Sequence, residues 1–355
     1  MIRVLLVDDS PIALLTISRI LETASDIEVV GRAGNGQEAL VLIPKLNPDV
    51  ICTDLHMPVM DGLRFTESVM QKFPRPILVI SISVFDSKSD NVFKLLQAGA
   101  VDVFAKPRAG LRAGDEAVAK ALIQKVRAIN GVVSFTRRTP RAQSISVSEK
   151  TIPVQMKSSI TSAHGSFEIV VIGASTGGPL AFEEILSALP ANFPLPIVCV
   201  QHISDGFLAG MVSWLDSLCK LKVKQAAHLE RTEPGIIYFA PEGKHLIVNK
   251  SKQLQYTPSD GTNLYCPAVD VLFDSVADQY QSRGLALLLT GMGDDGARGL
   301  KRIADHHGMT IAQDEASSIV FGMPHKAIEM KAARLVLPLA LMADKLVGLV
   351  EQSKA

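Results

Sequence analysis

The chain has 355 residues, the length of about two average domains. Hydrophobic residues make up 47% of it and charged residues 20%, which is typical of a globular protein with sizeable cores and excludes a disordered chain. The 36 basic residues balance the 36 acidic ones, so there is no net positive field of the kind that holds nucleic acid or an anionic membrane.

The apolar segments are too short to cross a bilayer, which takes about 20 apolar residues. The N-terminus turns acidic after a short apolar run and lacks the pattern of a secretory signal. The cysteines are Cys52, Cys199, Cys219 and Cys266. They lack metal-like spacing, and we expect them to be buried free thiols in a reducing compartment. The sequence therefore predicts a cytoplasmic protein without membrane insertion and without nucleic-acid binding.

Residues 1–130 alternate short apolar runs with helical periodicity, which is the pattern of a parallel sheet covered by helices. The strand-like runs are Val4–Val7, Val29–Gly31, Val50–Thr53, Ile77–Ser81 and Val101–Ala105. Apolar residues at helical spacing predict helices that include Ile12–Ala24, Gly36–Leu46 and Asp115–Ile129. This pattern predicts a flavodoxin-like domain with a five-stranded parallel sheet.

Residues 131–166 have a different composition. They contain eight Ser, four Thr, five basic residues and one acidic residue, with little apolar periodicity. Such a stretch is typical of a flexible linker. The basic residues would also suit a docking surface, but we favour solvated linker charge. We therefore expect a linker between two domains, residues 1–130 and 167–355.

A second α/β pattern begins at Phe167. Runs that predict parallel strands are Ile169–Ile172, Pro196–Gln201, Leu285–Thr290 and Met309–Gln313. Three shorter runs are Ile236–Ala240, His245–Asn249 and Gln253–Thr257, separated by turn-like Pro-Glu-Gly and Asn-Lys-Ser. These runs predict an antiparallel hairpin insertion. The C-terminal half is thus expected to be a doubly wound, Rossmann-like α/β domain with an antiparallel hairpin.

Reactive side chains stand at the carboxyl ends of the N-terminal strands. They are Asp8 and Asp9 after the first strand, Asp54 after the third, Ser81 at the end of the fourth and Lys106 after the fifth. Such ends share one edge of a parallel sheet, where ligands bind. Three converging carboxylates call for a hard divalent cation, and an all-oxygen ligand set favours Mg²⁺ over Zn²⁺. Asp54 would then accept a phosphoryl group.

The motifs around these residues are Val-Asp-Asp-Ser, Thr-Asp-Leu-His-Met-Pro-Val-Met-Asp-Gly and Ala-Lys-Pro. With them, the first 130 residues resemble the receiver domain of two-component response regulators. The resemblance implies that Asp54 is the phosphoacceptor and that Asp8 and Asp9 bind magnesium with it. It also implies that Ser81 and Lys106 contact the phosphoryl group.

Two positions depart from the usual receiver pattern. Ile82 is bulkier than the small residue that usually follows the hydroxyl, and Val103 stands where a switch aromatic is common, with Phe104 beside it. These differences leave the phosphorylation chemistry intact. They leave open whether the usual aromatic movement operates.

The segment Gly-Ala-Ser175-Thr-Gly-Gly-Pro follows a predicted strand and precedes a predicted helix. It nearly matches the G-x-G-x-x-G loop of dinucleotide-binding folds, and it also matches G-x-S-x-G. Ser175 favours the second interpretation, because a side chain at that place obstructs a pyrophosphate. The acidic ribose ligand expected at the end of the next strand is missing too, since that strand ends in Gln201-His202.

His202 would stand at the same sheet edge as Ser175, within reach as its general base. A third strand, Leu285–Leu289, leads into Thr-Gly-Met-Gly-Asp294-Asp295-Gly, where one acid would orient the imidazole. Singly, these residues fit a helix cap, a structural histidine and a turn; together they predict a Ser-His-Asp site. Their chain order differs from the Ser-Asp-His order of α/β-hydrolases.

Further stretches accompany this triad: Ala-Pro-Glu-Gly-Lys-His-Leu, Pro-Ala-Val-Asp-Val-Leu-Phe, Leu-Thr-Gly-Met-Gly-Asp-Asp-Gly-Ala and Val-Phe-Gly-Met-Pro. With them, the chain from Phe167 to about Leu341 resembles the catalytic domain of the chemotaxis protein-glutamate methylesterases, the CheB family. The resemblance implies that Ser175 is the nucleophile, His202 the base and Asp295 its partner. The oxyanion would lie near the backbone amides after Ser175, including Thr176, and near that of Met292.

One difference from the family concerns Cys266, which stands where arginine is common. The resemblance implies demethylation of glutamyl methyl esters and deamidation of glutamines on methyl-accepting chemoreceptors, with no metal in this domain. It further implies that the unphosphorylated receiver covers the catalytic cleft until a chemotaxis histidine kinase phosphorylates Asp54. The alternative is a phosphorylation-switched binding module whose serine loop holds an anion without turnover.

Overall fold

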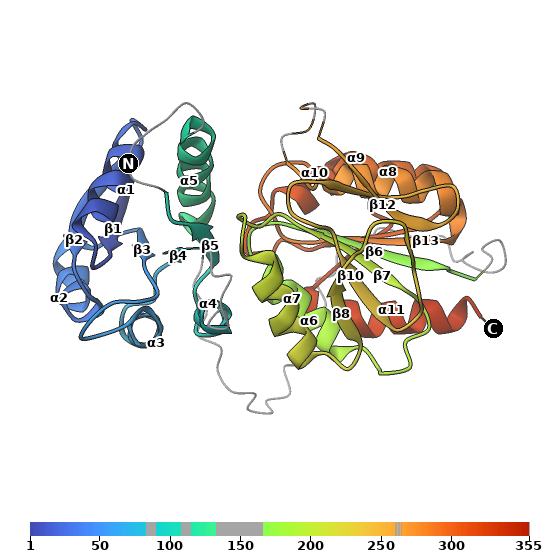
Figure 1. Cartoon of the computed structure of the whole chain (residues 1–355), viewed down its shortest axis with the longest axis horizontal. Helices are drawn as coiled ribbons and strands as arrows, with labels where there is room; N and C mark the ends of the chain where they lie inside the picture. The colour runs from blue at the N-terminus through green and yellow to red at the C-terminus, as the bar shows by residue number, and fades with distance from the viewer. Residues whose placement is uncertain are drawn as a thin grey trace.

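The computed structural model describes residues 1–82, 90–107, 115–132, 166–259, 261, 263 and 265–354, so most of the expected linker lies outside the described residues. These residues form two α/β units that lie side by side (Figure 1). No helix formed by the described residues is both long and apolar enough to span a membrane.

The N-terminal unit contains a parallel sheet with strand order β2-β1-β3-β4-β5. Its strands are β1 (Ile2–Val7), β2 (Ile27–Ala33), β3 (Val50–Thr53), β4 (Ile77–Ser81) and β5 (Asp102–Ala105). Its helices are α1 (Pro11–Glu22), α2 (Gly36–Leu46), α3 (Gly62–Lys72), α4 (Asp90–Gln97) and α5 (Asp115–Ile129). This is the expected five-stranded flavodoxin-like fold.

Alternation along β1 fills a core on each face of this sheet. Val4 and Leu6 pack in the core that includes residues of α1 and α5, whereas Leu5 and Val7 pack in the core shared with α2, α3 and α4. Local capping fixes where helices begin, since the Ser10 hydroxyl accepts from the Ala13 N–H at the start of α1.

The C-terminal unit is built on a seven-stranded parallel sheet with strand order β15-β14-β13-β6-β7-β10-β8. Its strands are β6 (Ile169–Ala174), β7 (Ile197–Gln201), β8 (Lys222–Gln225), β10 (Ile236–Phe239), β13 (Gly284–Leu288), β14 (Met309–Gln313) and β15 (Leu335–Leu337). The helices are α6 (Gly178–Ala188), α7 (Leu208–Leu218), α8 (Val269–Tyr280), α9 (Ala297–Asp305), α10 (Met323–Glu329) and α11 (Leu339–Gln352), with a short 3₁₀ helix over Gln281–Arg283. Because β7 and β13 flank β6, the chain changes direction beside β6, which is where doubly wound sheets bind ligands.

The antiparallel insertion differs from the expected one in one of its strands. Strands β11 (His245–Val248) and β12 (Gln253–Thr257) form the predicted hairpin, joined by β9 (Glu230–Arg231). The prediction that Ile236–Ala240 belongs to this hairpin is wrong, since β10 pairs in parallel with β7 and β8 in the main sheet. Its unbroken apolar run fits a parallel strand that is buried on both faces.

The burial of the thiols was also only partly predicted. Cys52 and Cys199 are buried in strands, but Cys219 and Cys266 are partly exposed. Cys219 lies at the end of α7 and Cys266 lies in the irregular segment before α8, so a sheet encloses neither thiol.

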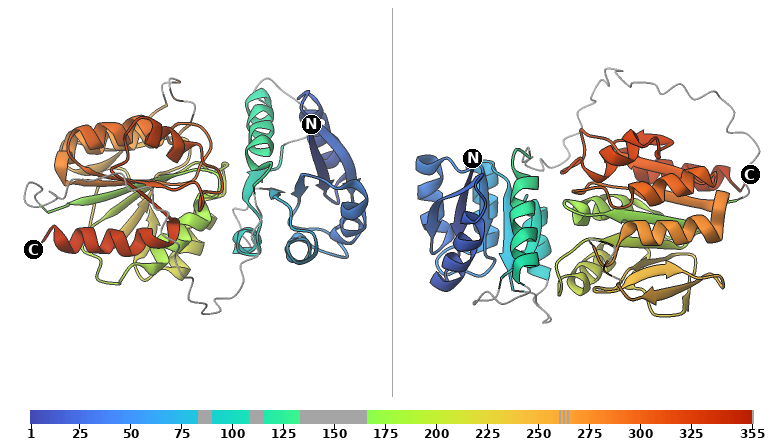
Figure 2. Two further views of the ribbon diagram at one scale, coloured as in Figure 1. Left: turned by 180° about the vertical axis from the view of Figure 1, so that it is seen from behind. Right: turned by 90° about the horizontal axis from the view of Figure 1, so that it is seen from above.

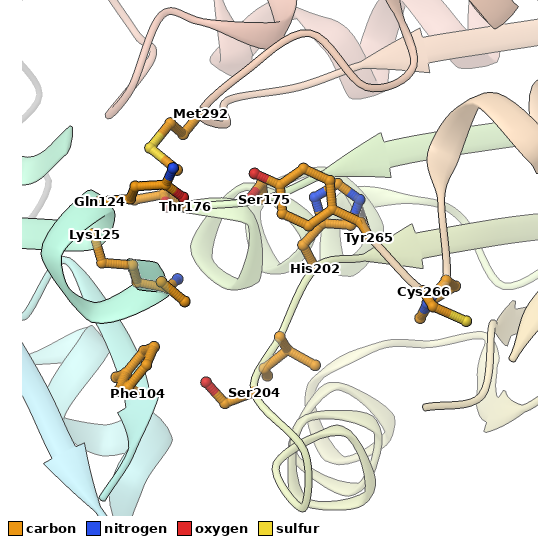
Figure 3. A pocket seen from close by; sticks show the side chains of 13 residues that line it. Phe104, Gln124, Lys125, Ser175, Thr176, His202, Ser204, Tyr265, Cys266 and Met292 are labelled. Carbon is orange, nitrogen blue, oxygen red and sulfur yellow. The ribbon is translucent and has the colours of Figure 1, made fainter. Parts of the chain in front are cut away.

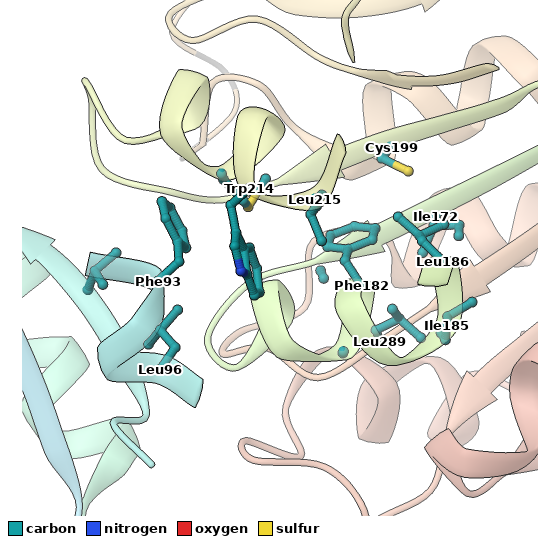
Figure 4. Packing of buried hydrophobic residues seen from close by; sticks show 14 of the residues in the cluster. Phe93, Leu96, Ile172, Phe182, Ile185, Leu186, Cys199, Trp214, Leu215 and Leu289 are labelled. Atoms are coloured by element: carbon teal, nitrogen blue, oxygen red, sulfur yellow. The ribbon is translucent and has the colours of Figure 1, made fainter. Parts of the chain in front are cut away.

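Helices α4 and α5 of the N-terminal unit lie beside the C-terminal unit in every view (Figures 1 and 2). The rings of Phe93 on α4 and Trp214 on α7 stack with centroids 5.2 Å apart, and one apolar cluster continues through them from one unit into the other (Figure 4). The Gln97 side-chain amide donates to Glu183 Oε1 at 2.9 Å. The receiver-like unit is thus docked on the C-terminal unit.

Candidate active site and phosphorylation site

The predicted acidic cluster of the N-terminal unit forms at the sheet edge. Asp8, Asp9 and Asp54 each offer a carboxylate oxygen, and these oxygens lie within 4.8 Å of one another. Asp8 and Asp54 are buried and Asp9 is exposed. β1 and β3 are neighbouring strands, and the order of the strands reverses between them. Their carboxyl ends therefore lie side by side and bring the three acids together.

Lys106 places its ammonium between two of these acids. Its Nζ lies 2.7 Å from Asp8 Oδ2 and 2.5 Å from Asp54 Oδ2. Burial raises the pKa of Asp8, and the bond from Lys106 offsets this only in part. Burial by itself lowers the pKa of Lys106, but its bonds to Asp54 and Asp8 outweigh burial and raise it. Three carboxylates and one ammonium leave the cluster with net negative charge, which a bound cation would neutralise.

Ser81 is buried at the end of β4, and the Lys106 N–H donates to its carbonyl at 2.8 Å. The structure therefore brings all five predicted residues of this unit to one edge. Ile82 is exposed and Val103 is buried. Phe104, next to Val103 on β5, lines a pocket shared with the C-terminal unit (Figure 3).

The second site lies at the carboxyl edge of the C-terminal sheet. Ser175 follows β6 and His202 follows β7, and the His202 N–H donates to the carbonyl of Ala174 at 3.0 Å. The Ser175 N–H in turn donates to the carbonyl of Thr290, which follows β13, at 3.0 Å. Backbone hydrogen bonds thus hold the ends of three neighbouring strands in register around Ser175.

His202 and Asp295 form a buried pair. The His202 Nε2 atom lies 2.8 Å from Asp295 Oδ2, with 7% and 10% of the two side chains exposed. The same carboxylate accepts the N–H groups of Val269 at 2.7 Å and Asp270 at 2.9 Å, in the first turn of α8. Burial alone raises the pKa of Asp295, but the bond and charge of His202 and these N–H groups lower it overall. Asp295 is therefore held as a carboxylate.

The opposite nitrogen of His202 is available. Nδ1 is buried and has no hydrogen-bond partner in the part of the chain that the structure describes. Because Asp295 fixes a proton on Nε2, Nδ1 carries the lone pair of the neutral ring. Asp294, the neighbouring acid, is exposed and does not bond to His202.

Close packing shapes the loop that carries Ser175. Gly177 adopts φ 80°, and a Cβ there would lie 2.6 Å from Ile319 Cβ. A Cβ on Gly178 would lie 1.9 Å from Oε1 of Gln201. The Gln201 amide donates to the carbonyls of both Ser175 and His202 at 2.8 Å. Small residues therefore let one glutamine tie the two loops together.

A pocket of about 210 Å³ opens at this edge (Figure 3). From the C-terminal unit it is lined by Ser175, Thr176, His202, Ile203, Ser204, Tyr265, Cys266, Pro267 and Met292. From the N-terminal unit it is lined by Phe104 on β5 and by Ala121, Gln124 and Lys125 on α5. The receiver-like unit thus forms one wall of the pocket that contains the serine and the histidine.

Comparisons with known proteins show the family of the chain. A family model described as CheB methylesterase matches residues 170–346, and one described as response regulator receiver domain matches residues 4–113. The protein-glutamate methylesterase/protein-glutamine glutaminase 1 of Syntrophus aciditrophicus is 41% identical over 98% of this chain and 98% of its own length. The chain belongs to the CheB methylesterase family.

Other members of the family support this assignment. The protein-glutamate methylesterase/protein-glutamine glutaminase 2 of Methanospirillum hungatei is 38% identical over 99% of both chains. The crystal structure of the Thermotoga maritima CheB methylesterase catalytic domain has a TM-score of 0.50 and 42% identity, covering 52% of this chain and 100% of that domain. The matched ranges fall inside the two expected domains, whose boundaries stay predictions.

Two features of this CheB-family pocket were not predicted from the sequence. Tyr265 stacks on His202, with ring centroids 4.1 Å apart and 13° between the ring planes. The role of Gln201 in tying the two loops together is the other feature. Its position directly before His202 was the one signal in the sequence that could have indicated this role. No signal in the sequence indicated Tyr265, because this residue lies in irregular chain.

Cys266, beside Tyr265, also lines the pocket. Burial raises the pKa of the Cys266 thiol, so the thiol is a weak nucleophile at neutral pH.

Proposed function

We propose that this protein hydrolyses the methyl esters of glutamyl side chains, and the amides of glutamine side chains, on methyl-accepting chemoreceptors, with Ser175 as the nucleophile. The observation that carries the proposal is that His202, which is bonded to Asp295, lines one pocket with Ser175. Membership of the CheB family supports the substrate class, since its relatives are named for these two activities.

The mechanism follows from the protonation of His202. With Asp295 bonded at Nε2, the lone pair on Nδ1 takes the hydroxyl proton as Ser175 Oγ attacks the ester carbonyl. The imidazolium then gives that proton to the departing methoxide oxygen, which leaves as methanol, or to the amide nitrogen, which leaves as ammonia. Water hydrolyses the acyl-enzyme by the same route and leaves a free glutamate. Asp295 balances the imidazolium charge in both steps.

The negative oxygen that forms during each attack needs hydrogen-bond donors. Thr176 and Gly177 lie between Ser175 and the start of α6 at Gly178, so their backbone N–H groups lie at the positive end of the helix dipole. We assign the oxyanion to these groups and to the amide of Met292, which lines the pocket. One such donor is typically worth about 3 kcal/mol of transition-state stabilisation.

Control of this activity belongs to the N-terminal unit. We assign Asp54 as the phosphoacceptor, with a chemotaxis histidine kinase as the donor in the cytoplasm, and Ser81 and Lys106 as the groups that contact the phosphoryl oxygens. The oxygen-only ligand set of Asp8, Asp9 and Asp54 fits Mg²⁺. When bound, Mg²⁺ would neutralise phosphoryl charge.

The coupling between the two sites has a short path. Lys106 holds Asp8 and Asp54, and it follows β5, which carries Phe104 into the pocket wall. A phosphoryl group on Asp54 competes for the Lys106 ammonium and so perturbs the end of β5. We propose that the unphosphorylated receiver restricts entry of receptor helices to Ser175 and that phosphorylation weakens its docking.

The test uses the full chain with methyl-labelled receptor membranes, with and without a small acyl phosphate as phosphodonor. Ser175→Ala is expected to lower methanol release by at least about 10³-fold while receptor binding persists, because the acyl-enzyme cannot form. Ser251→Ala, at an exposed turn remote from the pocket, serves as the matched control. Unchanged methanol release by Ser175→Ala would remove Ser175 as the nucleophile.

A further inference from the structure

Tyr265 covers one face of the histidine that the mechanism uses as a base. The two rings are nearly parallel, with centroids 4.1 Å apart and 13° between their planes (Figure 3). Tyr265 lies in the segment that leads into α8, outside the three strand ends that carry the other active-site residues. A different part of the fold therefore contributes this contact to the site.

The stacking limits how the imidazole can move. The bond from Nε2 to Asp295 fixes one point of the His202 ring but leaves the ring free to tilt about that bond. A tilt would change the direction in which Nδ1 points inside the pocket that it shares with Ser175. The flat face of Tyr265 opposes that tilt, because a rotated ring would overlap the phenol at this separation.

The stacking also favours the charged form of the ring. An aromatic face is electron-rich, and it attracts a cation within about 6 Å of its centroid. His202 is neutral before the reaction and becomes an imidazolium when it takes the serine proton. A contact that is stronger with the imidazolium than with the neutral ring lowers the barrier.

One segment organises both partners of Ser175. The N–H groups of Val269 and Asp270 hold the Asp295 carboxylate, and Tyr265, a few residues earlier, stacks on His202. The phenol stays neutral, since burial and then the charges of Asp295 and Asp294 raise its pKa. The phenol oxygen lies toward Gly293, beside the loop that carries Met292.

We infer that Tyr265 is a positioning residue, whose ring holds His202 in line with Ser175 and stabilises the imidazolium during hydrolysis. The inference rests on the proposed function, because it assigns His202 as the base. The aromatic ring of Tyr265 has this role, and its phenol hydroxyl does not.

The test compares Tyr265→Leu, Tyr265→Met and Tyr265→Phe in the phosphorylated full chain. The leucine and methionine variants are expected to lose about tenfold in kcat with KM nearly unchanged, the size of a desolvated cation–aromatic contact. Tyr265→Phe keeps the ring and is expected to retain wild-type kcat. Tyr256→Leu is the control, because it removes a second His–Tyr ring contact, the tilted pair with His228, which lies outside the pocket.

The pH profile separates positioning from mere loss of structure. Without the ring the imidazolium is less stable, so the acidic limb of the kcat/KM profile is expected to move to lower pH in the leucine and methionine variants. Among the described residues, Asp295 bonds to His202, Asp294 acts on the phenol of Tyr265, and Lys125 lines the pocket with its ammonium paired with Asp102. None of these groups changes in the variants. Titration with a serine-reactive phosphonate gives the folded, active fraction for each variant.

Two results would overturn the inference. One is wild-type kcat and an unmoved acidic limb in the leucine and methionine variants. The other is a phenylalanine variant as impaired as the leucine variant, which would transfer the role to the hydroxyl. Neither result would touch the proposed function, which fails only if Ser175→Ala keeps its activity.

Discussion

The two sites of this protein occupy the same place in two similar sheets, yet they are assembled differently. In the receiver every assigned group follows or ends a strand, so the sheet alone brings Asp8, Asp54 and Lys106 together. In the catalytic domain the chain after β6, β7 and β13 supplies Ser175, His202 and Asp295, but N–H groups of α8 hold the Asp295 carboxylate and Tyr265, before α8, stacks on His202. A parallel sheet thus suffices to gather charges, whereas orienting an imidazole takes further chain.

The largest effect is expected from replacing Asp295, the acid that orients His202. In Asp295→Asn the side-chain amide can donate to Nε2 of His202, which leaves the proton on Nδ1 and removes the lone pair that the proposed mechanism uses as the base. We expect kcat to fall about 10⁴-fold, because the ring then holds the wrong tautomer. The remaining side-chain oxygen of Asn still accepts the Asp270 N–H, whereas the Val269 N–H, which bonds to the same oxygen as His202, loses its acceptor.

The control for this prediction is the neighbouring acid. Asp294→Asn changes an exposed carboxylate and is expected to stay within about twofold of wild type. Methanol release from labelled receptor membranes measures both variants. Equal losses in the two would mean that the net charge of the loop matters and that the His202–Asp295 bond does not.

A smaller effect, confined to regulation, is expected from the receiver site. Asp54→Asn removes the carboxylate that would accept the phosphoryl group and one of the two partners of Lys106. We expect basal methanol release to stay within about twofold and the response to a small acyl phosphate to disappear. Asp26→Asn, at an exposed acid of the same unit, is the control and should keep that response. A retained response in Asp54→Asn would place the phosphoryl group elsewhere.

The sequence predicted the residues whose positions follow from topology. Once the strands were assigned as parallel, the strand-end residues had to share an edge, and the structure brings the predicted groups together there. The choice of Asp295 over Asp294 came from the family motif, and its bond to His202 agrees with that choice.

The rest depended on contacts that local patterns do not encode. Turn signals after Ile236–Ala240 suggested that this run belongs to the antiparallel hairpin, but it pairs in parallel with β7, a segment far away in sequence. Tyr265 lies in irregular chain, where hydrophobic periodicity does not indicate which way a side chain points. Phe104 and Gln124 reach the pocket only because the two units dock, and docking follows from surface complementarity and not from the pattern of either unit.

The smallest effect is expected where the two regions meet. Gln124 lines the catalytic pocket from α5 and carries the same side-chain amide as a glutamine substrate, so in the docked state it takes up space that a receptor side chain needs. Gln124→Ala is expected to raise the activity of the unphosphorylated chain about fivefold, the result of losing about 1 kcal/mol of docking free energy in a mostly closed equilibrium. The phosphorylated activity should not change, since in the proposed mechanism phosphorylation removes the receiver from the pocket.

The control for this contact is Gln71→Ala, at an exposed position of α3 away from the interface, which should leave both activities unchanged. The decisive quantity is the ratio of phosphorylated to unphosphorylated methanol release. A lower ratio in Gln124→Ala alone means that the two sites communicate through the docking equilibrium. If both activities rise in proportion, Gln124 acts on the chemistry of Ser175 instead, and the regions would be coupled through the pocket wall in every state of the receiver.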